Sequence, residues 1–257
     1  MNYDFTHVNS SPIEKIREAE TEMGNRVSLP DGYTLGKYIG QGSLVHVNEV
    51  KDAAGNTYAL KSPLKPKTWN EWPILRTAIL ADILLRGIEG EFRVPRIIKA
   101  GGYYIIEDKL ELEEGISSSE VENLSESKRD TLSRGMAEFM HAFNFPSPDK
   151  LQAVADYQKG EMFDRAGDLS GLWAEHYPRE FADFLQNDNN ASSMVYLDIK
   201  PANWFIDADG KFACPDLNAL RPGYVATQFR KMHYLMYDED FLKKLAGHYM
   251  DIHRERV

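Results

Sequence analysis

The alternation of apolar and polar residues is clearest between residues 33 and 61. The segments YTLGKYIG, LVHVNEV and TYALK alternate or cluster β-prone residues and are separated by glycine-containing breaks. This pattern predicts three antiparallel strands, with residues 53–56 (AAGN) as the tight turn between the second and the third. Residues 69–88 carry apolar residues at helical spacing, with Pro73 in the first turn. Two further strand patterns, VPRIIKAGG and YYIIEDKL, fall within residues 93–110, which predicts a five-stranded lobe with one helix.

The remainder of the chain has mainly helical patterns. Residues 132–145 are amphipathic and predict a helix, whereas the acidic, serine-rich stretch 111–130 before it predicts a solvated connection. Residues 146–192 are helical and irregular by turns, and the tail from Ala219 is mostly helical. Two short apolar runs, WFID and KFAC, flank the sequence Ala-Asp-Gly at 208–210, which is a strong signal for a β-hairpin.

These patterns divide the chain into three parts. Residues 1–30 are polar and are interpreted as an N-terminal extension, in which the sequence Ser-Ser-Pro at 10–12 predicts the start of a short helix. Residues 31–110 form a small antiparallel β lobe with one helix, and residues 111–257 form a reduced, mainly α-helical lobe. The predicted fold class is therefore α+β with two lobes, and no internal repeat is visible.

Composition excludes several functional classes. The 257 residues are 42% apolar and 27% charged, with a net charge of −10 and an isoelectric point of about 5.2, which argues against a broad nucleic-acid-binding surface. The single cysteine, Cys214, excludes a disulfide framework within the chain. No apolar run is long enough to span a membrane, and the N-terminus lacks the apolar stretch of a secretory signal. We therefore expect a cytoplasmic protein.

The residues that carry chemistry are concentrated in a segment that reads D-I-K-P-A-N, a hairpin, then D-L-N. Phosphoryl transfer needs an oriented nucleophile, cations that bridge the phosphates, and compensation of developing charge. Asp198 can orient an attacking hydroxyl and accept its proton, and Lys200 can neutralise charge on the moving phosphoryl group. Asn203 and Asp216 supply the oxygen ligands that Mg²⁺ prefers. The segment predicts a phosphotransfer site with Mg²⁺, or Mn²⁺ in its place.

This segment resembles the catalytic and metal-binding loops of protein kinases, H-R-D-x-K-x-x-N followed by D-F-G. The matching positions are Asp198, Lys200, Asn203 and Asp216. The His-Arg pair of the family is Tyr196-Leu197 in this chain, and the Phe-Gly pair is Leu217-Asn218. The resemblance implies a protein-kinase-like fold with ATP as the phosphoryl donor, bound in a cleft between the two lobes.

A second match lies in the first lobe, where IGQGSLVHV is similar to the glycine-rich loop G-x-G-x-x-G-x-V of the same family. Across this loop and the A-x-K motif of the next strand, the matching residues are Gly40, Gly42, Val47, Ala59 and Lys61. The third glycine is replaced by Val45. The resemblance implies that the glycine backbone lies close to the phosphates and that Lys61 contacts the α- and β-phosphates.

In this family a glutamate on the following helix pairs with the lysine. Glu71 is the first candidate, although it lies only ten residues after Lys61 and also fits an exposed acid in a first helical turn. Asp82 lies on a better-placed turn but has a shorter side chain. The connection between the lobes is expected around Glu107, where the backbone would hydrogen-bond the edge of adenine.

The chain departs from the family at three places. Leu197 replaces the arginine that grips a phosphorylated activation loop, and no A-P-E sequence follows Asp216, so activation by loop phosphorylation is not expected. About fifty residues separate the 132–145 helix from Asp198, an insertion that resembles aminoglycoside and choline phosphotransferases, which share the fold. Those relatives usually lack a lysine at the position of Lys200, which favours a Ser or Thr hydroxyl on a protein as acceptor.

Three functions follow from these residues. The favoured one is a protein serine/threonine kinase, similar to the minimal kinases among bacterial effectors, which are delivered into a host cell. The second is a small-molecule kinase, whose cationic substrate would suit the acidic stretch 156–188. The third is a pseudokinase, which Leu217-Asn218 allows and the intact Lys61 and Asp198 oppose. The acidic residues of that stretch are Asp156, Glu161, Asp164, Asp168, Glu175, Glu180, Asp183 and Asp188.

Overall fold

The chain divides into two compact units in the computed structural model. One unit contains Met1–Asp82 and Pro95–Lys109, and the other contains Ile83–Val94 and Leu110–Val257. The segment 83–94, which its sequence assigns to the first lobe, therefore groups with the second unit. The structure describes residues 29–42, 44–64, 74–101, 104–115, 121–158, 176–187, 194–200, 203–217, 219–235 and 238–256.

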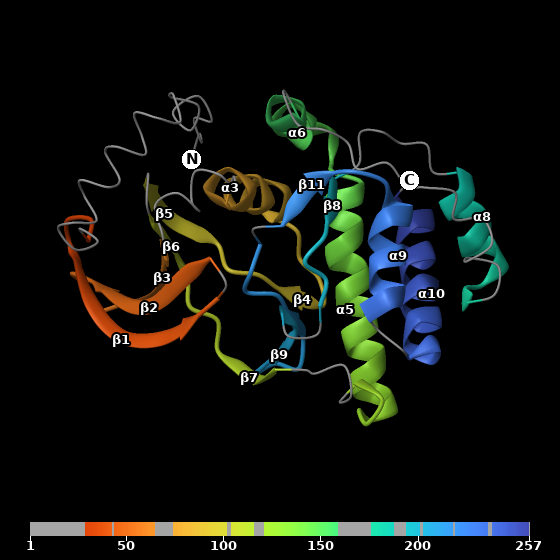
Figure 1. The fold of residues 1–257 in the computed structure, drawn as a ribbon, viewed down its shortest axis with the longest axis horizontal. Coiled ribbons are helices and arrows are strands. Elements are labelled where there is room, and N and C mark those ends of the chain that lie inside the picture. The colour runs from red at the N-terminus through yellow and green to blue at the C-terminus, as the bar shows by residue number, and fades with distance from the viewer. Residues whose placement is uncertain are drawn as a thin grey trace. The chain divides into compact units, whose positions relative to one another are not determined.

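The first unit is built on a five-stranded antiparallel sheet with the order β1-β2-β3-β6-β5 (Figure 1). This confirms the five strands expected from the alternation of residues. The strands are β1 (Tyr33–Gln41), β2 (Val45–Asp52), β3 (Thr57–Pro63), β5 (Ile97–Gly101) and β6 (Tyr104–Asp108).

Local sequence fixes the predicted turn between β2 and β3. Asp52 accepts three hydrogen bonds within this turn. Its side-chain Oδ1 accepts from the backbone N–H groups of Ala54 and Asn56 at 2.9 Å, and its backbone carbonyl accepts from the N–H of Gly55. Gly55 has a φ of 86°, in the region that favours glycine. The turn thereby sets the β2–β3 register.

One helix, α3 (Ile74–Leu85), accompanies the sheet, and its last turn belongs to the second unit. In the first unit, the Asp82 carboxylate accepts a hydrogen bond from the backbone N–H of Ile97 at 3.0 Å, which ties the helix to β5. The predicted turns of this helix before residue 74 lie outside the described residues, as does the helix expected near residue 12.

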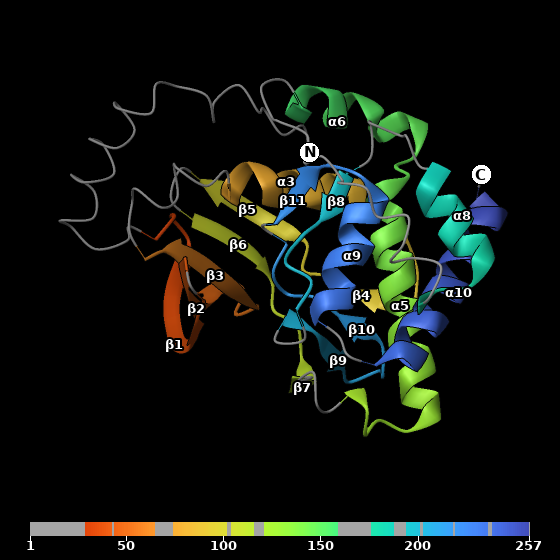
Figure 2. The same ribbon diagram turned by 45° about the vertical axis from the view of Figure 1, so that its right-hand side comes forward.

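The second unit is organised around α5 (Glu126–Asn144), which α10 (Glu239–Arg256) accompanies in Figure 1 and in the rotated view of Figure 2. The helix starts earlier than expected because Ser125 caps it and accepts from the N–H of Lys128. The other helical elements of this unit are η2 (Pro148–Lys150), α6 (Leu151–Gln158), α8 (Arg179–Asn187) and α9 (Val225–Leu235). Across the described ranges, none of the helices has the length and apolar character needed to cross a membrane.

Asn144 joins four elements of the second unit at the C-terminal end of α5. Its side-chain nitrogen donates to the carbonyl of Met194 at 2.7 Å and to Oε1 of Gln228 at 3.0 Å. Its oxygen accepts from the hydroxyl of Tyr249 at 2.7 Å. All four residues are buried, and these hydrogen bonds fix α5 against α9, α10 and the strand that carries Met194.

Two small sheets complete the second unit. One has the order β4-β10-β9-β7, and the other pairs β11 with β8. The β9–β10 hairpin confirms the turn expected at 208–210, where Gly210 has a φ of 80°. The expectation that 111–130 is only a solvated connection is wrong, because it contains β7 and the start of α5. The strands are β4 (Phe92–Arg93), β7 (Leu112–Gly115), β8 (Met194–Tyr196), β9 (Phe205–Asp207), β10 (Phe212–Ala213) and β11 (Leu220–Pro222).

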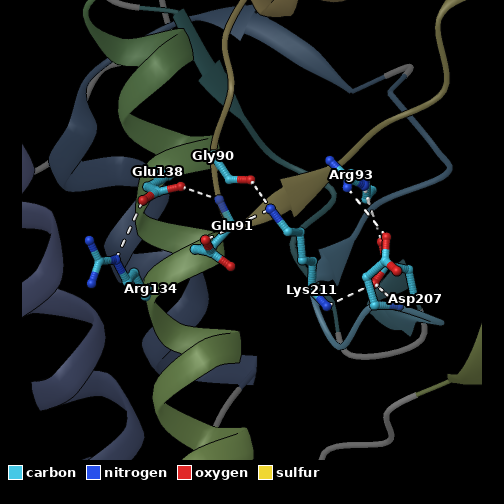
Figure 3. A network of polar contacts seen from close by, with 8 residues as sticks. Gly90, Glu91, Arg93, Arg134, Glu138, Asp207 and Lys211 are labelled. Carbon is cyan, nitrogen blue, oxygen red and sulfur yellow. Dashed lines mark hydrogen bonds and ion pairs between the residues drawn. The ribbon is translucent and has the colours of Figure 1, made fainter.

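Polar contacts join the segment around β4 to α5 and to the β9–β10 hairpin (Figure 3). Glu138 of α5 accepts a hydrogen bond from the backbone N–H of Glu91 at 2.5 Å. Lys211 at the hairpin turn places its Nζ 3.8 Å from a carboxylate oxygen of Glu91, and its backbone N–H donates to Asp207. Arg93 pairs with the same Asp207 at 3.3 Å. The hairpin that leads to Asp216 is therefore fixed by charged contacts as well as by its own strand pairing.

Candidate active site

The segment between residues 197 and 219 is closed at its two ends by the β8–β11 pair. Leu220 lies opposite Tyr196 in this pair, and the backbone N–H of Leu197 donates to the carbonyl of Ala219 at 3.0 Å. The segment contains all four residues predicted to carry out phosphoryl transfer. Short strands on either side therefore fix where the segment with these predicted residues begins and ends.

Within this segment, Asp198 is held through one of its two carboxylate oxygens. The side-chain nitrogen of Asn203 donates to Oδ2 at 2.7 Å and to the Asp198 carbonyl at 3.0 Å. The ammonium of Lys200 lies 3.1 Å from the same Oδ2. In the described part of the chain, these contacts leave Oδ1 open to accept a proton. Asp198 is 30% exposed, so an acceptor hydroxyl can reach it.

Asp216 is positioned through its backbone. The hydroxyl of Tyr196 donates to the Asp216 carbonyl at 2.5 Å, and the thiol of Cys214 contacts the Tyr196 hydroxyl at 3.5 Å. Tyr196 is buried, and this burial raises the pKa of its phenol well above the usual value, with smaller contributions from Cys214 and Asp216. The hydroxyl therefore stays protonated and acts as a donor.

The side chain of Asp216 has an unusual environment. Its Oδ1 is buried, and none of the described residues gives it a hydrogen bond. A buried carboxylate oxygen without a donor or cation is costly, so such an oxygen is expected to bind a ligand.

A hard divalent cation fits this environment. Asn203 uses its side-chain nitrogen for Asp198, which leaves its amide oxygen as the atom available to a metal. No group of three His, Cys, Asp or Glu residues gathers as a metal site in the described ranges. Mg²⁺ accepts few protein ligands because it keeps several waters and binds substrate phosphates. Asn203 and Asp216 thus supply a neutral and a charged oxygen suited to Mg²⁺.

In the first unit, the sheet register brings the predicted nucleotide residues together. Val47 lies opposite Lys61 on neighbouring strands, and Ala59 is two residues before Lys61, so the three side chains share one face. Gly40 and Gly42 lack a positive φ, and a Cβ at Gly42 would meet no atom nearer than 3.8 Å, while one at Gly40 would meet nothing within 4 Å. The described contacts of this unit therefore do not themselves require a glycine at either position.

Among the described residues, Glu107 places its carboxylate against Lys61. Lys61 Nζ lies 2.7 Å from Glu107 Oε1, and the two side chains are only 11% and 7% exposed. The backbone contact with adenine expected at Glu107 stays a prediction, and the Glu107 side chain, within β6, contacts Lys61. Of the two acids proposed from the sequence as partners of Lys61, Glu71 lies outside the described residues. The carboxylate of Asp82 accepts a hydrogen bond from the backbone N–H of Ile97. An acid inside the apolar strand pattern YYIIEDKL is the signal that points to this pair.

The acidic stretch considered for a cationic substrate is only partly described. Glu180 and Asp183 lie on α8 with most of each side chain exposed. Glu180 pairs with Arg254 at 2.6 Å, and Asp183 lies 3.9 Å from Arg179. These two acids therefore neutralise basic side chains at the surface. The side chains of the other six acids lie outside the described residues.

Comparison with known proteins gives a result at the level of the fold. No family model matches the chain, and no curated protein matches its sequence. Solved structures do match: the streptomycin–ATP–APH(2")-IIa ternary complex aligns over 97% of this chain and 85% of its own, with a TM-score of 0.53 and 14% identity. The chain has the protein-kinase-like fold.

Other solved structures with this kinase-like fold include two further phosphotransferases. Macrolide 2'-phosphotransferase MphH from Brachybacterium faecium aligns over 91% of this chain and 82% of its own, with a TM-score of 0.51 and 16% identity. The GDP complex of an aminoglycoside 2'-phosphotransferase aligns over 93% and 82%, with a TM-score of 0.53 and 11% identity. The kinase-like fold and the two-lobed α+β class expected from the sequence are thereby confirmed.

Proposed function

We propose that this kinase-like chain transfers the γ-phosphate of Mg²⁺-ATP to a hydroxyl group of a small molecule. The observation that supports this most strongly is the state of the two aspartates in the second unit. Asp198 is fixed through one oxygen and offers the other, while Asp216 presents a buried oxygen that no described group satisfies. A proton acceptor and a metal ligand on one closed loop are what phosphoryl transfer requires.

Each residue has a defined role in this proposal. Asp198 accepts the proton of the attacking hydroxyl, and Lys200 compensates charge on the transferred group. Asn203 and Asp216 would hold Mg²⁺, which would supply positive charge to the phosphates. Lys61 binds the α- and β-phosphates, and the backbone at Gly40, near the end of β1, lies close to them. The remaining residues of the proposed nucleotide site are Gly42, Val47, Ala59 and Glu107.

A small acceptor fits the chain after Asp216 better than a protein does. The backbone re-enters regular structure at Leu220, where β11 pairs with β8, so only a short stretch lies between Asp216 and the next strand. The matched solved structures are those of phosphotransferases for aminoglycosides or macrolides, and this supports the same substrate class. This reverses the preference for a protein acceptor that the sequence alone suggests.

A serine or threonine hydroxyl on a protein is the second candidate. The observation in its favour is Lys200, whose ammonium lies 3.1 Å from the Asp198 carboxylate, where the sequence resembles protein kinases. The two candidates share the same donor, metal and proton acceptor, so the acceptor assay decides between them.

The deciding experiment incubates the chain with Mg²⁺, γ-labelled ATP and three acceptor sets: aminoglycosides and amino-alcohols, macrolides, and a protein mixture. We expect label to enter a small molecule and not protein. Asp198→Asn is expected to stop the transfer, whereas Asp209→Asn, a matched change in the exposed hairpin turn, is expected to leave it intact. Label only in protein would establish the second candidate. ATP binding without transfer to any acceptor would establish a pseudokinase.

A further inference from the structure

The Lys61–Glu107 pair has a geometry that the sheet itself enforces. Ala59 lies opposite Glu107 on the neighbouring strand, and Lys61 lies opposite Ile105. Glu107 and Lys61 are therefore diagonal neighbours on one face of the sheet, within reach of two long side chains. Because both residues sit inside paired strands, the 2.7 Å contact depends on strand register and not on the conformation of a loop or helix.

Burial makes this pair different from the other ion pairs on the same sheet. Glu49 is on the same face by register, but it contacts Lys37 and Lys109, at 3.9 Å and 3.6 Å, and Lys37 is largely exposed. Lys61 and Glu107 are both nearly excluded from water. A buried ammonium needs a compensating carboxylate to remain charged and to keep a single orientation.

We infer that Glu107 is a positioning residue that holds the Lys61 ammonium in the orientation in which it binds the nucleotide phosphates. The inference rests on the proposed function, since it requires that Lys61 contacts phosphate. It assigns to a β6 side chain a role for which the sequence offers only Glu71 and Asp82. An ammonium has three N–H donors, so the contact with Glu107 is compatible with a second contact to phosphate.

This role predicts a specific dependence on the phosphates of the ligand. A side chain that acts through Lys61 affects binding of ATP and leaves binding of adenosine unchanged, because adenosine has no phosphate. A residue that reads the base would affect both ligands equally. A purely structural residue would lower the unfolding temperature without separating ATP from adenosine.

The experiment measures the dissociation constants of ATP with Mg²⁺ and of adenosine by calorimetry. Glu107→Gln is expected to weaken ATP binding about tenfold or more, and to change adenosine binding less than about twofold. The matched control Glu49→Gln removes the same charge from the same sheet face and is expected to leave both constants nearly unchanged. In the Lys61→Met background, Glu107→Gln is expected to have no further effect on ATP binding.

Glu107→Asp keeps the carboxylate and allows the test even if Glu107→Gln does not fold. Its shorter side chain is expected to give an ATP affinity between wild type and Lys61→Met, with unchanged adenosine binding. Equal losses for ATP and adenosine, unchanged ATP affinity in the folded variants, or additive losses in the double variant would each overturn the inference while leaving the proposed function intact. A wild-type chain that does not bind ATP would overturn both.

Discussion

The hydroxyl of Tyr196 and the carbonyl of Asp216 are joined by a hydrogen bond of 2.5 Å. This bond connects β8 directly to the loop that carries the proposed metal ligand. Tyr196 lies two residues before Asp198, so one short stretch of chain sets the position of both aspartates. The buried phenol also packs edge-on against Phe139 of α5, with ring centroids 5.4 Å apart, which fixes the tyrosine itself.

Replacement of Tyr196 by Phe tests this connection. The variant leaves the Asp216 carbonyl with only the weak thiol contact of Cys214 at 3.7 Å, and we expect a loss of about 1–3 kcal/mol in unfolding free energy. The Mg²⁺ concentration needed for half-maximal activity is expected to rise. Urea unfolding and a metal titration measure the two effects. The control Tyr177→Phe removes another buried hydroxyl, with a longer 3.5 Å bond, and is expected to leave the metal requirement unchanged.

Asp198→Asn separates turnover from binding. The amide keeps the size of the side chain but cannot accept the proton of the acceptor hydroxyl, so we expect the transfer rate to fall by about 10²–10⁴-fold. The dissociation constant of ATP is expected to change little, because Asp198 faces the acceptor in the proposed geometry. A variant that transfers phosphate at the wild-type rate would show that Asp198 is not the proton acceptor.

Asp216→Asn is expected to have opposite effects on stability and on function. The buried, unsatisfied carboxylate oxygen is costly without a cation, so its neutralisation is expected to raise the unfolding temperature of the metal-free chain. The same change removes the charged metal ligand and is expected to abolish the gain in ATP affinity that Mg²⁺ gives. Thermal unfolding with and without Mg²⁺-ATP measures both effects. A destabilised metal-free variant would contradict this account of Asp216.

The pH dependence of stability is expected to include a contribution from His141. Burial, together with smaller contributions from the nearby His253 and Arg256, lowers the pKa of His141 from 6.5 to about 3. The ring packs against Tyr249, and its Nε2 lies 3.4 Å from Nδ1 of His253. The folded chain thus keeps His141 neutral, whereas the unfolded chain protonates it below about pH 6.5.

His141 destabilises the folded state at acidic pH. Because the unfolded state binds more protons between pH 6.5 and about 3, the free energy of unfolding falls as the pH is lowered through this range. The limiting slope is about 1.4 kcal/mol per pH unit. His141→Gln is expected to remove this part of the slope, while carboxylates contribute equally to both proteins. Parallel curves for the two proteins in urea unfolding from pH 6.5 to 4.5 would refute the assignment.

The elements with strong side-chain patterns were predictable from the sequence. The alternation of β1 to β3 and the Asp-Gly turn of the β9–β10 hairpin depend on local preferences, and the structure contains them. The strands β7 and β11 were not predictable because they have three or four residues and are specified by backbone pairing. In β7, the sequence LEEG carries two acids, and its pairing with β9 requires only backbone groups, for example at Leu112 and Asp207.

The aspartates of the proposed site were found because their spacing along one loop is short and fixed. The sequence does not link the Glu107 side chain to Lys61, because the two residues are 46 positions apart and meet only through the β3–β6 register. Tyr196 was noted only as a departure from the family pattern, since sequence does not show that its hydroxyl reaches the Asp216 carbonyl. Contacts between distant strands require the tertiary structure.

The β8–β11 pair has a consequence for how activity is lost when the protein opens locally. Asp198, Asn203 and Asp216 lie on one excursion of the backbone whose two ends meet at Leu197 and Ala219. Separation of these two short strands releases all of them in the same event, as expected for a cooperative unit of hydrogen exchange. We therefore expect partial opening to remove the proposed activity in a single step, and the exchange rate of the Leu197 amide, which donates to Ala219, to report that step.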